Sequence, residues 1–105
     1  MEFISDPELA ADLLERFADF LEQGLPYGAA FLAAAWRSKI DPGATLKFMA
    51  DKFRDGLVPC SALIEPLIAA DLVEIVRSGE REGDVISHMR IAAGVSRRAS
   101  SPNAS

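Results

Sequence analysis

Acidic side chains recur near the start of the chain at the spacing of one helical face. They are separated by four, three, four and three residues and comprise Glu8, Asp12, Glu15, Asp19 and Glu22. Residues three and four apart lie on the same side of a helix, so the five carboxylates form one stripe, called here the acidic stripe. Three interpretations stay open: a solvated face, a contact face for a basic partner, or a weak divalent-cation site at a subunit boundary. The last would need oxygen ligands from further elements.

A second candidate partner-binding site is the segment "SGEREGD". Gly79 is predicted to end a helix in the left-handed conformation that residues with a Cβ resist. Gly83 would allow a second bend, and Asp84 would cap the next helix. Glu80 either accepts hydrogen bonds from backbone N–H groups of the turn or of the last helix's start, or projects toward a partner.

The other residues with reactive side chains form no catalytic or metal-binding pattern. His88 is the sole histidine, so one chain offers no two-histidine metal site; it is predicted to be a solvated residue on the outer or boundary side of the last helix. Cys60 stands at a helix start, which can lower a thiol pKa, but a small half-buried residue is the favoured interpretation. Phosphate-loop, dinucleotide and nucleophile-elbow motifs are missing. We therefore expect no enzyme activity, no cofactor and no metal.

Length, composition and charge narrow the class of protein. The 105 residues, half of them hydrophobic, suffice for one domain with a core. The net charge is −5, and residues 1–24 alone contribute −6. Because phosphate binding needs clustered Lys and Arg, no nucleic-acid partner is expected. A lone cysteine fits a reducing cytoplasm. The acidic start of the chain is unlike a secretory signal, which is basic. No apolar run reaches the roughly 18 residues that a membrane span needs.

Proline, glycine and capping residues divide the chain into six predicted helices. Asp6 before Pro7, and Asp41 before Pro42, are typical of helix starts. The predicted ranges are 7–24, 26–39, 42–56, 59–65, 66–79 and 84–95. The second range is apolar almost all round, so we expect Phe31, Leu32 and Trp36 to provide bulk in the core.

The helices and their short connections predict an all-α fold, a compact antiparallel bundle of six short helices. We expect this domain to span residues 1–96. Residues 97–105 are small, polar and proline-containing, and are predicted to be a disordered tail.

Once the six helices are placed, the chain resembles the type II secretion system F domain. The segments that resemble it are "FADFLEQGLP" at 17–26, "FMADKFRDGLVPCSALIEP" at 48–66 and "LVEIVRSGEREGDVISHM" at 72–89. In the last of these, an apolar helix followed by Gly79, Glu80 and then Gly83 is similar to the family's most recognisable segment. The resemblance covers about 13–95, most of the chain.

The resemblance implies a non-catalytic scaffold domain on the cytoplasmic face of the bacterial inner membrane. Members of the family are membrane-embedded platform proteins of type II secretion and type IV pilus machines. The implied partners are the assembly ATPase, other platform subunits and further copies of the protein itself.

The chain departs from the family pattern in three ways. It has no transmembrane segment and no second copy of the domain, which suggests a soluble portion of a longer protein. Arg97 and Arg98 would then flank a membrane span that follows. The stretch between the fourth and fifth helices is also shorter than in the family. The alternative hypothesis is a free-standing cytosolic helical adaptor or regulator that binds a partner protein.

Overall fold

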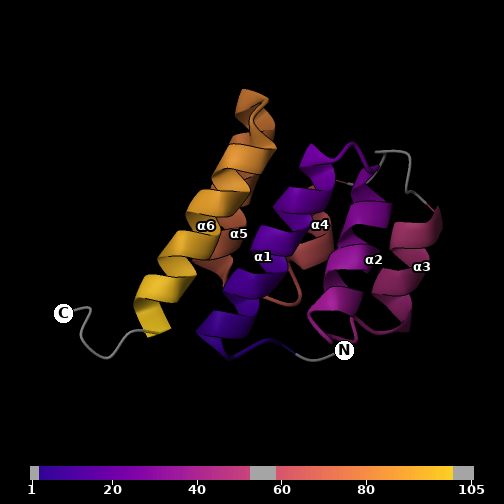
Figure 1. The fold of residues 1–105 in the computed structure, drawn as a ribbon, viewed down its shortest axis with the longest axis horizontal. Helices are drawn as coiled ribbons and strands as arrows, with labels where there is room; N and C mark the ends of the chain where they lie inside the picture. Colours follow the sequence, from indigo (N-terminus) through magenta and orange to yellow (C-terminus); the bar gives the residue numbers. More distant parts are fainter. Residues whose placement is uncertain (1–2, 53–58, 101–105) are drawn as a thin grey trace.

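The computed structural model describes residues 3–52 and 59–100, and over these ranges it contains six helices and no strand (Figure 1). The helices are α1 (Pro7–Glu22), α2 (Tyr27–Arg37), α3 (Ala44–Lys52), α4 (Cys60–Ile64), α5 (Ala70–Glu82) and α6 (Val85–Ser100). The radius of gyration is 12.6 Å, close to the value of about 13 Å for a compact domain of this length. The predicted all-α fold is confirmed.

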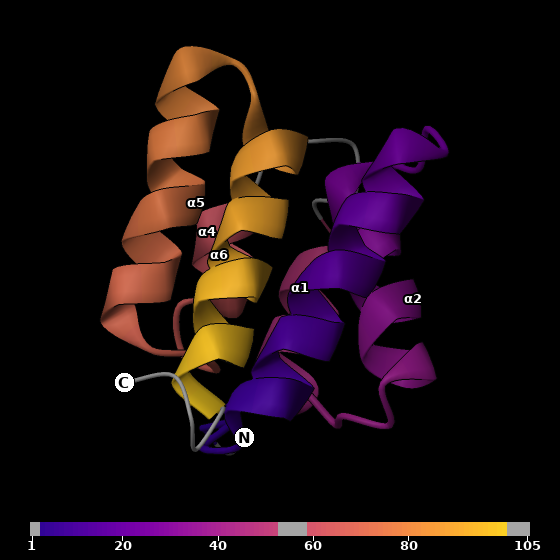
Figure 2. The ribbon, with the colours of Figure 1, turned by 60° about the vertical axis from the view of Figure 1, so that its left-hand side comes forward.

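Helix α1 lies at the centre of the bundle. It packs against α6 on one side and α2 on the other, while α5 covers α6 and α3 extends the layer beyond α2 (Figures 1 and 2). Helix α4 lies behind α1 and contacts α2, α3 and α5. Helices α5 and α6 form an antiparallel hairpin (Figure 2), and the ion pairs between α1 and α6 show that these two helices also run antiparallel.

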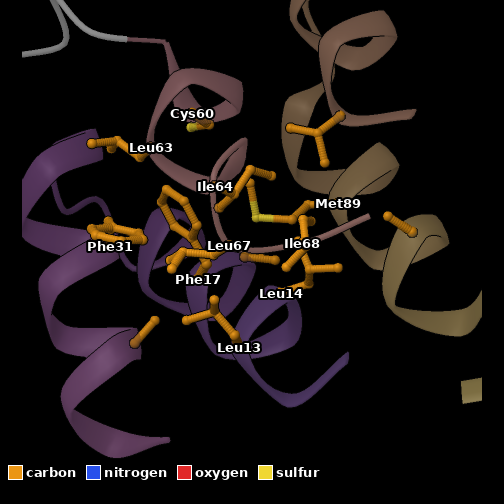
Figure 3. Close-up of a cluster of buried hydrophobic side chains, with 14 of the residues drawn as sticks. Leu13, Leu14, Phe17, Phe31, Cys60, Leu63, Ile64, Leu67, Ile68 and Met89 are labelled. Carbon is orange, nitrogen blue, oxygen red and sulfur yellow. The ribbon is translucent and has the colours of Figure 1, made fainter. Parts of the chain in front are cut away.

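The hydrophobic core lies where α1, α2, α4 and α6 meet (Figure 3). Phe17 of α1 and Phe31 of α2 contact each other edge to face, with ring centroids 5.7 Å apart. The other large side chains that are fully or almost fully buried include Leu13, Leu14, Leu46, Leu63, Ile64, Leu67, Ile68, Val76 and Met89. The core thus draws on both ends of the chain.

The start of α1 forms as its sequence predicts. Pro7 occupies the first turn, and the Asp6 carboxylate accepts a hydrogen bond from the Glu8 backbone N–H at 3.0 Å. Both features stabilise the N-terminus of the helix, where the first backbone N–H groups have no intrahelical acceptor. Asp6 supplies an acceptor, and Pro7 has no N–H group that needs one. The helix ends at Glu22, and Gly24 follows with a φ of +97°.

The prediction that Trp36 supplies bulk to the core is wrong. Its side chain is 78% exposed, whereas Phe31, Ala34 and Ala35 face the core. Because α2 is apolar on nearly every side, its sequence does not indicate which face is buried. The small alanines form the packed face, and Trp36 lies outside it.

The predicted starts of α3 and α5 are also wrong. Asp41 accepts a hydrogen bond from the Gly43 backbone N–H at 2.9 Å, and Gly43 has a φ of +88°, so a turn replaces the expected first helical residues. Helix α5 starts at Ala70 instead of residue 66, because Leu67 turns back onto Ile64 and is buried. The predicted end of α3, at residue 56, lies outside the described residues.

Helix α6 continues to Ser100, past the predicted end at 95 and the domain boundary at 96. Polar contacts hold the added turn to α1: the buried Ser96 hydroxyl donates to the Pro7 carbonyl at 2.7 Å, and Arg97 pairs with Glu15. Residues 97–100 are therefore helical, and the prediction of a disordered tail beginning at 97 is corrected for them. The remainder of that tail lies outside the described residues.

None of the helices within the described residues is both long enough and apolar enough to cross a bilayer.

Candidate functional site

The connection between α5 and α6 is shorter than the sequence suggests, because Gly79 does not end α5. It lies inside the helix, which continues to Glu82. Gly83, with a φ of +75°, takes the left-handed position predicted for Gly79. The Asp84 N–H donates to the Gly79 carbonyl at 2.8 Å, which closes the helix end as in the Schellman pattern. The prediction for Gly79 is thus wrong.

Gly79 is required for a different reason, the close approach of α6. A Cβ at this position would lie 2.5 Å from the His88 Cβ, 2.8 Å from its Cγ and 2.9 Å from the Asp84 carbonyl oxygen. Contacts below 3.0 Å are not tolerated without movement of the neighbouring atoms. Gly79 therefore permits the α5–α6 packing.

His88 lies on the side of α6 that faces Gly79 of α5, and its side chain is 21% exposed, so it is partly buried rather than solvated. Its Nδ1 is 3.0 Å from the Asp84 carbonyl oxygen, and its Nε2 is 3.5 Å from the Glu82 carboxylate. Asp84 directly precedes α6, and its carbonyl accepts the His88 backbone N–H at 3.3 Å. These contacts fix the geometry of the turn.

Glu80 points toward α4, neither into the turn nor toward the start of α6. Its carboxylate accepts the Ser61 backbone N–H at 3.3 Å, in the first turn of α4. A negative charge there complements the unsatisfied N–H groups of a helix start. Burial and, secondarily, the Glu80 charge raise the pKa of the Cys60 thiol. Cys60 is a fully buried core residue rather than an activated nucleophile.

Replacing Glu80 with glutamine is expected to lower the free energy of unfolding by about 0.5–1 kcal/mol, because the charge at the α4 start is lost while an acceptor oxygen remains. Partner binding should change little. Thermal melts measure the change in stability, and the affinity of the variant for a binding partner measures the second effect. A large loss of affinity with unchanged stability would instead indicate a partner-facing role for Glu80.

The acidic stripe is an inter-helix seam rather than a free face. Arg90 of α6 contacts Asp19 at 2.8 Å and Glu22 at 3.1 Å. One helical repeat further on, Arg97 pairs with Glu15 and lies 3.7 Å from Glu8. All four carboxylates keep substantial solvent exposure, so each pair contributes only about 0–1 kcal/mol. Together they set the register of α6 along α1.

Asp12, the remaining member of the stripe, links α1 to the end of α2. It accepts hydrogen bonds from the Arg16 guanidinium at 2.9 Å and from the buried Ser38 hydroxyl at 2.8 Å. Burial alone would raise the pKa of the Asp12 carboxyl, but these two hydrogen bonds outweigh it and lower the pKa below 3.8. The ionised form is therefore favoured in the folded protein.

This lowered pKa predicts an acid-sensitive contribution to stability. A carboxyl whose pKa is lower folded than unfolded stabilises the fold above its unfolded pKa of 3.8, and that contribution disappears as the pH falls through the folded pKa. We expect the Asp12→Asn variant to lose less stability than the parent between about pH 5 and pH 3. Urea denaturation at each pH measures this, and identical pH profiles would contradict it.

Neither Arg90 nor Arg97 was predicted to pair with the stripe, although Arg97 was expected to flank a membrane span. Arg90 and Arg97 are seven residues apart, two turns of one helical face, and that spacing was the available signal. The spacing matches the stripe in either direction of α6 along α1, so the pairing itself depends on the tertiary fold. Over residues 3–52 and 59–100, no three histidine, cysteine, aspartate or glutamate side chains come together in a way that could hold a metal ion.

The two predicted sites meet at a shallow groove of about 820 Å³ along α6. Glu22 of the acidic stripe and Asp84 of the turn both line it, together with Arg90 and the half-exposed Ile91. Gly79 and Glu80 do not line it. The structure therefore joins one residue from each predicted site and assigns Gly79 and Glu80 to packing.

The end of this groove nearest the α5–α6 connection is acidic. Asp19 and Glu22 share Arg90, whereas Glu82 and Asp84 are exposed and pair with no arginine or lysine among the described residues. The α5–α6 connection also projects beyond the ends of the neighbouring helices (Figures 1 and 2). We call this end of the molecule the acidic tip: Asp19, Glu22, Glu82 and Asp84.

Comparisons of the chain with protein-family models, with curated proteins and with solved structures found no match.

Proposed function

We propose that this chain is a docking domain of the type II secretion F kind, from the platform of a type IV pilus or type II secretion machine. It acts by binding rather than by catalysis. Its proposed partners are the cytoplasmic assembly ATPase and other platform subunits, at the inner face of the bacterial inner membrane. The sequence resemblance and the six helices in the corresponding order support this proposal.

The observation that best supports docking is the convergence of the two predicted sites on the acidic tip. Asp84 from the turn and Glu22 from the stripe line one groove, although they are far apart in sequence. The half-exposed Ile91 in the same groove provides an apolar contact. Glu22, Asp84, Arg90 and Arg98 are the charged residues that line the groove, and the excess of carboxylates lies at the acidic tip. That tip can attract and orient a basic partner surface.

The test is the affinity of the purified domain for the assembly ATPase, measured by calorimetry at several salt concentrations. A variant with Glu22→Gln, Glu82→Gln and Asp84→Asn keeps the side-chain shapes and removes three charges from the tip. We expect its affinity to fall about tenfold, with a smaller salt dependence than the parent. Asp71→Asn, in the first turn of α5 at the other end of that helix, is the matched control.

Two outcomes would contradict the proposal. Unchanged affinity in a folded triple variant would show that the ATPase docks elsewhere. If the parent domain does not bind the ATPase, the proposed platform function is contradicted. The alternative hypothesis, a free-standing adaptor, would then be favoured.

A further inference from the structure

The two most exposed large apolar side chains among the described residues lie on α2 and α3. Trp36 is 78% exposed and Phe48 is 64% exposed. Helix α3 forms one edge of the bundle, beyond α2, while α5 and α6 lie on the other side of α1 (Figure 1). Exposed apolar side chains that gather on one surface are a sign of an interaction site.

Both aromatic residues border one shallow groove of about 840 Å³, which Ala33 and Trp36 of α2 and Asp51 of α3 help to line. Trp36 and Arg37 lie three and four residues after Ala33, a spacing that puts them on the same side of the helix. Phe48 lies three residues before Asp51 and shares a side of α3 with it. The exposed sides of the two helices therefore form one surface, which we call the α2–α3 face.

The cations of this face are less neutralised than those of the other helices. Arg37 and Lys39 are exposed and pair with no carboxylate among the described residues, whereas Lys47 pairs with Asp41 at 3.1 Å. Every other arginine whose side chain is described pairs with a carboxylate, apart from Arg98 near the end of α6. Two of the three unpaired cations thus lie beside the exposed tryptophan.

The net charge of the sequence is divided in the same way. Residues 27–52, which contain α2, α3 and their connection, carry +2, from four lysines and arginines against two aspartates. Residues 1–26 carry −6, and residues 59–105 carry −1. A negatively charged surface therefore attracts the α2–α3 face and repels the side of the molecule that contains the acidic stripe.

Lys39 has a backbone conformation that favours glycine. Its φ is +58°, and it follows α2 at the position where glycine is usual in the Schellman pattern. The Lys39 N–H donates to the Trp36 carbonyl at 3.1 Å, and the Ile40 N–H donates to the Ala35 carbonyl at 2.8 Å. Because glycine would fit this backbone better, the fold alone does not explain a lysine here. Residues at such positions occur most often where they have a function.

We propose that the α2–α3 face binds directly to a lipid bilayer that contains anionic phospholipids. Trp36 and Phe48 enter the layer between the headgroups and the acyl chains, where aromatic side chains are favoured. Arg37 and Lys39 contact the headgroup phosphates, to which exposed lysines and arginines are attracted. The acidic tip, on the opposite side of the bundle from α3, then faces away from the bilayer (Figure 1).

A bilayer fits this face better than a protein partner does. The groove is shallow and the Trp36 side chain beside it is largely exposed, whereas protein interfaces typically bury such anchors in matching pockets of the partner. A bilayer accepts exposed aromatic side chains without a matching shape, and its negative headgroups complement the unpaired cations.

This inference goes beyond the proposed function. The family resemblance implies anchoring through membrane-spanning segments of a longer protein, whereas here the helical domain itself binds lipid through a surface. The inference applies equally to a free-standing adaptor. Its test uses lipid and no ATPase, so its failure is distinguishable from a failure of docking at the acidic tip.

The experiment measures binding of the purified chain to vesicles by co-sedimentation and by the fluorescence of Trp36, the sole tryptophan. The vesicles contain phosphatidylcholine alone or phosphatidylcholine with about 30% phosphatidylglycerol. We expect binding to the anionic vesicles to be at least about tenfold tighter, and to be lost at about 1 M salt, where the Debye length is about 3 Å. The Trp36 emission should shift to shorter wavelength, and brominated lipids should quench it, because the indole enters the bilayer.

Charge variants identify the cations that bind the headgroups. Arg37→Gln and Lys39→Gln should each weaken binding to anionic vesicles about fivefold. Arg98→Gln removes the unpaired arginine of α6 and is the matched control, which should leave the affinity unchanged. Lys39→Gly should also weaken binding but should not lower the melting temperature, because glycine suits the positive φ.

Aromatic variants test insertion into the bilayer. Trp36→Ala and Phe48→Ala should each reduce co-sedimentation with anionic vesicles about tenfold. Because both side chains are exposed, folding should persist, which thermal melts verify. Ile91→Ala removes an exposed apolar side chain from α6 and should leave lipid binding unchanged.

Three outcomes would overturn the proposal. A folded chain that does not bind the anionic vesicles has no lipid-binding face. Binding that Arg98→Gln or Ile91→Ala weakens as much as the variants of the α2–α3 face do takes place on another surface. A Trp36 emission shift that requires a second protein and no lipid assigns the face to a protein partner.

Discussion

Replacing Gly79 with alanine is expected to lower the free energy of unfolding by about 1–2 kcal/mol, although alanine is the better helix former by about 1 kcal/mol. The added Cβ would meet two side-chain atoms of His88 and the backbone oxygen of Asp84, all within 3.0 Å. The backbone oxygen belongs to the start of α6 and cannot move without shifting that helix. Overpacking of this kind costs about 1–3 kcal/mol or more, which exceeds the gain in helix propensity.

Gly94 provides the matched control for this prediction. It also lies inside a helix, α6, but a Cβ there would meet only the Arg98 guanidinium at 3.7 Å, an ordinary contact. Gly94→Ala is therefore expected to raise the free energy of unfolding by up to about 1 kcal/mol. Each kcal/mol corresponds to about 4–8 °C in melting temperature for a domain of this size. Shifts of the same sign in both variants would contradict the close packing at Gly79.

Truncation of Phe17 to alanine should have the largest effect of any single change considered, a loss of about 3–5 kcal/mol. The ring is fully buried between α1, α2 and α4, and it contacts Phe31 edge to face (Figure 3). Because whole domains are stable by about 5–15 kcal/mol, this loss removes a large share of the total. Urea denaturation gives the value directly.

The aromatic pair itself can be tested with the double variant of Phe17 and Phe31. If the rings interact beyond the area that they bury, the two losses should be coupled by about 0.5–1.5 kcal/mol. Phe48→Ala, which removes an exposed ring from α3, should change stability by less than about 0.5 kcal/mol. Additive losses for the buried pair would mean that the rings contribute only through burial.

The number and order of the helices could be predicted because local signals determine them. Asp6 and Pro7 satisfy the start of α1 without help from the rest of the chain, and the apolar spacing of Leu13 and Phe17 places both on the buried side. Where a signal depended on tertiary contacts, prediction failed. Both Gly79 and Gly83 can adopt a positive φ, but only Gly83 does, whereas Gly79 leaves room for His88 of α6, a contact that the sequence does not reveal.

The candidate site was predicted in part, for the same reason. The spacing of the acidic stripe predicts a row of carboxylates on α1, of which four contact α6 whereas Asp12 bonds to Ser38 at the end of α2. The partners on α6 lie far away in sequence: Arg90 is 71 residues from Asp19, and Arg97 is 82 residues from Glu15. The burial of Trp36 was predicted wrongly for a related reason. A helix that is apolar on nearly every side does not indicate which side packs against the core. The Gly-Glu pair that supports the family resemblance lies within α5 here, so the helix end that this segment implies falls four residues later, at Gly83.

The packing of α1 between α2 and α6 has a consequence for biosynthesis. The ribosome makes α1 first and α6 last, so the inner surface of α1 lacks half of its cover until nearly the whole domain has emerged. Contacts between such distant segments also slow folding, because a long loop must close before they form. We therefore expect nascent chains stalled before residue 85 to be captured by chaperones, and protease resistance to appear only after the last helix leaves the exit tunnel.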